Sequence, residues 1–134
     1  MTDLVFFYGT LMSGFKRRGR ERLDAQLTPV GRGFIHAALF DVGLYPAAIP
    51  ASDASVQGEL HRMSDAESVL RELDDIEGFR PEQPDSSLYQ RLETPVTLPD
   101  GRTETAWTYF YNAPLGNAPR IDSGDYLDYL RVKR

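Results

Sequence analysis

The chain of 134 residues contains no cysteine and only two histidines. The absence of thiols excludes disulfides, cysteine zinc sites, iron–sulfur clusters and thiolate nucleophiles. His36 and His61 lie far apart and do not have the spacing of a joint metal site, so we interpret each as a strand residue. We therefore predict no metal and no cofactor. We expect any catalysis to use carboxylates, hydroxyls and backbone amides.

Positive charge is also scarce, because 15 Lys and Arg residues stand against 20 Asp and Glu residues, for a net charge of −5. Phosphate contacts need a surplus of cations, so this balance argues against a nucleic-acid partner. One basic cluster departs from it: Lys16, Arg17, Arg18, Arg20 and Arg22. We interpret the cluster as a solvated loop or helix start. The alternative is that one of these cations attracts an anionic substrate to a neighbouring pocket.

Long hydrophobic runs are missing as well. No segment approaches the roughly 20 apolar residues of a membrane-spanning helix. The apolar run at residues 4–7 is too short for a signal peptide. The length suits one domain with a single core. We expect a cytoplasmic protein without a membrane partner, formed by a single domain over residues 1–134.

A glycine turn directly follows the first apolar run. Residues 4–7 (Leu-Val-Phe-Phe) predict a short strand, and the next four residues are Tyr8, Gly9, Thr10 and Leu11. A turn of this kind gathers backbone N–H groups in one concavity, which suits a carboxylate or an oxyanion. We predict that this turn binds substrate. The alternative is that it only changes the direction of the chain.

The pattern after Ser64 predicts one amphipathic helix. Ser64 and Glu67 have the spacing of a capping box, and Gly78 is typical of the residue just beyond a helix end. Apolar residues with helical spacing lie between these signals: Ala66, Val69, Leu70, Leu73 and Ile76. The charged residues that we expect at the sides of the helix or toward water are Glu67, Arg71, Glu72, Asp74 and Asp75.

Glu77 lies within this apolar stripe, at the C-terminal end of the predicted helix. Loss of solvation and the negative end of the helix dipole both disfavour a charged carboxylate there, so we expect a raised pKa. We predict that Glu77 acts as a general acid and base. One alternative is that Glu77 extends to solvent or pairs with Arg80 or Arg91. Glu59 is the rival carboxylate.

Most of the remaining chain is predicted as strands. The predicted strands are residues 4–7, 33–41, 56–61, 89–98 and 105–112. Residues 99–102 (Pro-Asp-Gly-Arg) are a hairpin signal. Five strands around one helix, without an alternating βαβ pattern, favour an α+β fold built on a small mixed or antiparallel β-barrel with flanking helices.

Three tyrosines are further candidates for a pocket. Tyr109 and Tyr111 share one face of the last predicted strand with Trp107, while Thr108 belongs to the opposite face. One of these rows should lie in the core and the other should form a pocket or a second layer. Tyr45 lies in a Gly-Leu-Tyr-Pro turn and is a candidate for the pocket rim.

Several motifs occur in a distinctive order. They are Tyr8-Gly9-Thr10-Leu11, Gly58-Glu59-Leu60, Leu73-Asp74 with Glu77-Gly78, Tyr89 with Arg91, and Ala106-Trp107-Thr108-Tyr109. From residue 4 to about residue 130, this order resembles the gamma-glutamylcyclotransferase-like family, in particular its short branch of AIG2-like proteins and gamma-glutamylamine cyclotransferase. The resemblance implies a small mixed barrel with a pocket at the glycine turn. It implies that Tyr8 to Leu11 form the substrate-binding loop and that Glu77 is catalytic.

The reaction that the resemblance implies releases an amine from a small gamma-glutamyl substrate as 5-oxoproline forms. The substrate's own alpha-amine closes a five-membered ring on the gamma-carbonyl, and this closure needs no metal. Two other functions stay open, namely a non-catalytic module that binds an amino acid or another small carboxylate, and amide hydrolysis. The sequence does not indicate which amine leaves.

Overall fold

The secondary structure is mixed, and most of it is in strands. In the computed structural model, the described residues are 2–12, 20–43 and 45–133. In chain order the elements are β1 (Leu4–Phe7), α1 (Arg20–Asp24), β2 (Leu27–Ile35), β3 (Ala37–Asp41), β4 (Pro46–Pro50), β5 (Val56–Met63), α2 (Ala66–Glu77), the 3-10 helix η1 (Pro84–Ser86), β6 (Tyr89–Thr97), β7 (Thr103–Tyr111) and α3 (Tyr126–Lys133). Lys16, Arg17 and Arg18 of the basic cluster lie outside the described residues.

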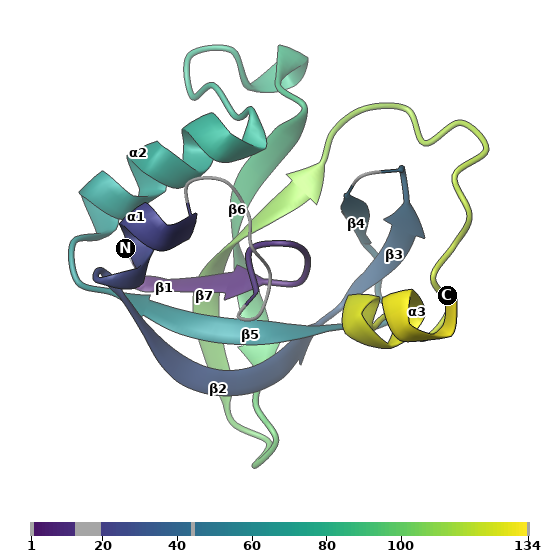
Figure 1. The fold of residues 1–134 in the computed structure, drawn as a ribbon, viewed down its shortest axis with the longest axis horizontal. Helices are drawn as coiled ribbons and strands as arrows, with labels where there is room; N and C mark the ends of the chain where they lie inside the picture. The colour runs from purple at the N-terminus through teal and green to yellow at the C-terminus, as the bar shows by residue number, and fades with distance from the viewer. Residues whose placement is uncertain (1, 13–19, 44, 134) are drawn as a thin grey trace.

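Five strands close into a barrel in the order β1-β5-β2-β6-β7. Neighbouring strands are antiparallel, except that β1 and β7 run parallel where the barrel closes. Figure 1 shows α2 lying across one side of the barrel. It also shows α3 near β3, to which Tyr129 of α3 is tied by a 2.7 Å hydrogen bond to the Asp41 carboxylate. The predicted α+β fold with a small mixed barrel and flanking helices is therefore confirmed.

The barrel strands are buried to different extents. Along β7, Ala106, Thr108 and Phe110 of one face are buried, and so is Tyr109 of the other face, which lines a pocket. The backbones of β1 and β5 approach so closely that a Cβ atom at Gly58 would lie 2.3 Å from the carbonyl oxygen of Phe7. Only glycine fits at that point of the barrel.

One predicted strand is wrong as a single unit. The segment 33–41 divides between β2, which belongs to the barrel, and β3, which pairs with β4 in a separate two-stranded sheet. His36 lies at the bend between the two strands and is exposed, so its predicted place in a strand is wrong as well. The apolar pattern runs through the bend because β3 is also buried. For that reason, periodicity alone did not indicate the break.

The hairpin prediction is confirmed. β6 and β7 pair antiparallel from Tyr89↔Tyr111 to Thr97↔Thr103. Gly101 in the connecting turn has φ 88°, a left-handed conformation that favours glycine.

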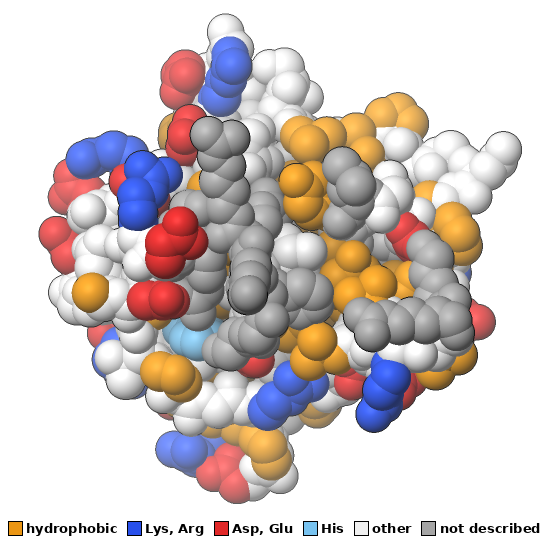
Figure 2. All heavy atoms as spheres, viewed as in Figure 1, with side chains coloured by type: hydrophobic (Ala, Val, Ile, Leu, Met, Phe, Trp, Pro, Cys, Tyr) orange, Lys and Arg blue, Asp and Glu red, His pale blue; other side chains and the backbone are white. Residues whose placement is uncertain are grey.

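The helix α2 forms as predicted but begins differently. Its N-cap is Asp65, whose side chain accepts a 3.2 Å hydrogen bond from the Ser68 N–H, so the predicted capping role of Ser64 is wrong. Gly78 ends the helix in the left-handed conformation, as predicted. Figure 2 shows acidic and basic side chains mixed over the outer surface of α2. Among the described residues, no helix is long and apolar enough to span a membrane.

Candidate active site

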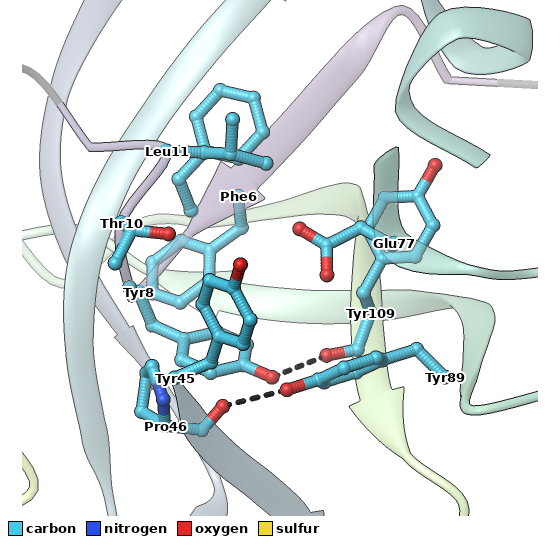
Figure 3. A pocket seen from close by; sticks show the side chains of 11 residues that line it. Phe6, Tyr8, Thr10, Leu11, Tyr45, Pro46, Glu77, Tyr89 and Tyr109 are labelled. Carbon is cyan, nitrogen blue, oxygen red and sulfur yellow. Dashed lines mark hydrogen bonds between the residues drawn. The ribbon is translucent and has the colours of Figure 1, made fainter. Parts of the chain in front are cut away.

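A pocket forms where the end of β1, the start of β4, the end of α2 and the strands β6 and β7 meet (Figure 3). Its lining residues are Phe6, Phe7, Tyr8, Gly9, Thr10, Leu11, Tyr45, Pro46, Glu77, Tyr89 and Tyr109. The fold thus brings together Glu77, the glycine turn, Tyr45 and Tyr109, all of which the sequence singled out. Tyr111 is not among the lining residues and packs edge-on against Tyr89, with ring centroids 5.3 Å apart.

The glycine turn forms one wall of this pocket. Met12 donates its backbone N–H to the Gly9 carbonyl at 3.0 Å, which closes the turn. A Cβ atom at Gly9 would lie 2.7 Å from Cγ of Pro46. The requirement for glycine therefore comes from the close approach of β4 and not from a turn conformation alone.

Two tyrosine hydroxyls brace the walls against each other. Tyr8 is buried and donates to the Tyr109 carbonyl at 2.6 Å, which ties the turn to β7. Tyr89 donates to the Pro46 carbonyl at 2.9 Å, which ties β6 to the start of β4 (Figure 3). Sequence reasoning missed the pocket roles of four residues, Phe6, Phe7, Pro46 and Tyr89. For Phe6 a signal was present, since strand alternation places it on the same face as Tyr8.

Glu77 carries the only carboxylate among the described residues that line the pocket. Its side chain is half-buried. Figure 3 shows its carboxylate pointing into the pocket, toward the side formed by the glycine turn and Tyr45. Glu59, the rival carboxylate, is not a lining residue and lies 3.2 Å from Nε2 of His61 on β5.

Two buried tyrosines of the pocket, Tyr8 and Tyr109, have raised pKa values. Burial raises the pKa of Tyr8 well above its ordinary value, and Tyr89 and the charge of Glu77 add to the rise. Burial also raises the pKa of Tyr109, followed by the charge and hydrogen bond of Asp74 and, more weakly, by the charge of Glu77. At neutral pH these phenols are therefore hydrogen-bond donors and not bases.

Asp74 is buried, which corrects the expectation that it projects to the side of α2 or toward water. Its Oδ1 accepts from the Tyr109 hydroxyl at 2.6 Å and from Nε of Arg91 at 2.9 Å. Its Oδ2 accepts from a terminal nitrogen of Arg91 at 3.3 Å. The Arg91 guanidinium lies 4.5 Å from the ring centre of Trp107 and 5.6 Å from that of Phe79. Helical spacing placed Asp74 beside the stripe but carried no signal of these partners on β6 and β7.

Comparisons with known proteins agree with this architecture. Residues 5–128 match the family model described as gamma-glutamyl cyclotransferase, AIG2-like. The gamma-glutamylcyclotransferase family protein YtfP of Escherichia coli K12 is 33% identical over 125 residues, which cover 92% of this chain and 96% of that protein. The solution structure of ytfP from Escherichia coli matches with a TM-score of 0.67 and 28% identity, covering 94% of this chain and 97% of that one. An AIG2-like protein from Mus musculus shares the fold, with a TM-score of 0.69 and 24% identity, covering 92% and 87% of the two chains.

Proposed function

The chain belongs to the gamma-glutamyl cyclotransferase, AIG2-like family, and we propose that it converts a gamma-glutamyl amine or gamma-glutamyl amino acid into 5-oxoproline and a free amine. One observation carries the proposal. Glu77, the only carboxylate among the described lining residues, shares its pocket with the glycine turn. A proton-transfer group therefore faces a wall suited to an anion.

The proposed reaction is an internal acyl transfer. The alpha-amine of the gamma-glutamyl group attacks the gamma-carbonyl carbon, and a new C–N bond closes the five-membered ring. The bond from that carbon to the leaving nitrogen then breaks. Because the nucleophile is part of the substrate, the enzyme has to hold the folded conformation and move protons.

Glu77 moves the protons in this proposal. The alpha-ammonium group first loses one proton to solvent, which frees the amine to attack. The Glu77 carboxylate takes the second proton, which the attacking nitrogen gives up as the ring closes. It then returns a proton to the leaving nitrogen, so that the amine departs neutral. The lining tyrosines Tyr8 and Tyr109 do not compete for this role, because their raised pKa values keep them protonated.

In this proposal the glycine turn binds oxygen atoms of the glutamyl group. Residues 8–11 hold the alpha-carboxylate or support the oxyanion that develops on the gamma-carbonyl oxygen. The Thr10 hydroxyl faces the same space (Figure 3). The braces from Tyr8 and Tyr89 hold the turn and the start of β4 at a set separation, which is the preorganisation that such binding needs.

Mass-spectrometric detection of 5-oxoproline tests the proposal. Wild type, Glu77→Gln and the matched control Glu59→Gln are incubated with gamma-glutamyl amines, gamma-glutamyl amino acids and glutathione. We expect 5-oxoproline from wild type and Glu59→Gln but not from Glu77→Gln. Free glutamate in its place would indicate hydrolysis. Thermal stabilisation by a compound that is recovered unchanged would indicate a binding module.

A further inference from the structure

A series of hydrogen-bonded residues links the helix that carries Glu77 to the glycine turn. Arg91 of β6 donates to Asp74, one turn before Glu77 on α2. Tyr109 of β7 donates its hydroxyl to the same carboxylate, and its backbone carbonyl accepts from the Tyr8 hydroxyl. The series therefore runs Arg91, Asp74, Tyr109, Tyr8 and crosses the pocket wall from one functional element to the other.

We infer that Asp74 and Arg91 are positioning residues, which hold the last turn of α2 and Tyr109 so that Glu77 keeps a set place relative to the substrate turn. The inference rests on the proposed function for its kinetic consequence. Neither residue is among those that line the pocket, so neither is proposed to touch the substrate.

Burial makes this pair unlike an ordinary surface ion pair. The side chains of Arg91 and Asp74 are 16% and 11% exposed. Burying two charges has a desolvation penalty that can equal or exceed their attraction, so net stability is a weak explanation for such a pair. The three hydrogen bonds to Asp74 instead set the orientation of each partner.

The Arg91 side chain is itself held by packing. Its guanidinium lies over Trp107 of β7 and near Phe79, the residue just after the helix cap Gly78. A planar guanidinium makes both the paired hydrogen bond and the ring contacts, which an ammonium does not reproduce. Arg91 therefore contacts residues on both sides of Glu77 in the sequence: Asp74 within α2 and Phe79 just after the helix.

Steady-state kinetics of 5-oxoproline formation test the inference. Asp74→Asn keeps the shape and an acceptor oxygen but removes the charge. We expect kcat to fall about 10- to 100-fold, because a small misplacement of a reacting group has an effect of this size. We expect KM to stay within about threefold, because the substrate turn is intact. Arg91→Lys should lose less kcat than Arg91→Met.

Two further variants complete the kinetic test. Tyr109→Phe removes only the hydroxyl and leaves the ion pair, so it remains informative if Asp74→Asn fails to fold. Glu67→Gln alters an exposed ion pair on the same helix and should leave both constants unchanged. An unchanged kcat in Asp74→Asn and Tyr109→Phe would overturn the inference.

A second readout is independent of turnover. In protein labelled with ¹³C-glutamate, the Glu77 carboxyl resonance is assigned by its loss in Glu77→Gln. At fixed pH we expect it to shift in Asp74→Asn and Tyr109→Phe but not in Glu67→Gln. If the wild type forms no 5-oxoproline, the proposed function is contradicted. The shift of the Glu77 resonance in the variants then tests the positioning role without an activity measurement. An unmoved resonance overturns the inference.

Discussion

The two ends of α2 use their acidic side chains in different ways. Near the start, Glu67 pairs with Arg71 at 3.3 Å, and these side chains are 83% and 76% exposed. In the last turns, Asp74 pairs with Arg91 at 2.9 Å in a largely buried network, and Glu77 faces the pocket. Helical spacing indicated the pocket position of Glu77 but did not indicate that Asp74 would be buried, so spacing alone does not set the surroundings of a carboxylate. For Asp74, its partners Arg91 on β6 and Tyr109 on β7 decide.

The largest contrast between the two ends should appear in stability. Arg91→Met leaves the buried Asp74 charge without its partner, and we expect the free energy of unfolding to fall by about 3 to 5 kcal/mol. Arg71→Met removes an exposed partner of Glu67, and we expect less than about 0.5 kcal/mol. Urea unfolding measures both values. Equal losses in the two variants would contradict the distinction between the ends.

The second contrast concerns catalysis. Glu77→Gln keeps the side-chain shape but removes the carboxylate that we propose transfers protons, so we expect kcat for 5-oxoproline formation to fall about 10²-fold or more. This corresponds to about 2.7 kcal/mol in the activation barrier. Glu67→Gln at the exposed end should retain the wild-type rate. Both variants should unfold as cooperatively as wild type, and similar rates in the two would argue against the assignment of Glu77.

Unfolding measured over a range of pH tests the burial of two pocket tyrosines, Tyr8 and Tyr109. The pKa values of Tyr8 and Tyr109 are raised in the folded protein, so the unfolded chain loses these protons at a lower pH. Stability should be unaffected by them below the ordinary tyrosine pKa of about 10 and should fall as the pH rises above it. The expected fall is about 1.4 kcal/mol per pH unit for each such tyrosine. Tyr109→Phe should show a shallower fall in urea unfolding above pH ~10, and the full wild-type slope would contradict this account.

The smallest expected effect lies at the exposed start of α2. Asp65→Ala removes the acceptor for the Ser68 N–H, and we expect a loss of about 1 kcal/mol in the free energy of unfolding. Ser64→Ala should have a smaller effect, because Ser64 is not the N-cap. Thermal or urea unfolding distinguishes the two caps, and the reverse order would restore the capping box that the sequence predicted.

Features that depend on a few neighbouring residues were predictable. The hairpin from β6 to β7 follows from its Asp-Gly turn, and the end of α2 follows from the apolar stripe and Gly78. The motif order also identified the family, which the comparisons confirm. The start of α2 was placed wrongly because Ser64 and Asp65 are both good capping residues. Local sequence does not choose between them.

Features that join distant segments were not predictable. The division of residues 33–41 depends on the pairing of β3 with β4, and the burial of Asp74 depends on Arg91 and Tyr109 from two other strands. A pattern within one segment has no information about such partners.

The amino-acid sequence was sufficient to identify the family, the approximate positions of β1, α2, β5, β6 and β7, and Glu77 and the glycine turn as candidates. These depend on residue type and short-range periodicity, which are written along the chain. Only the three-dimensional fold placed Glu77 and the glycine turn in one pocket, left Tyr111 out of that pocket, and buried Asp74 against β6 and β7. Barrel closure sets these contacts, because it brings together residues from β1, α2, β6 and β7 that are far apart in the sequence.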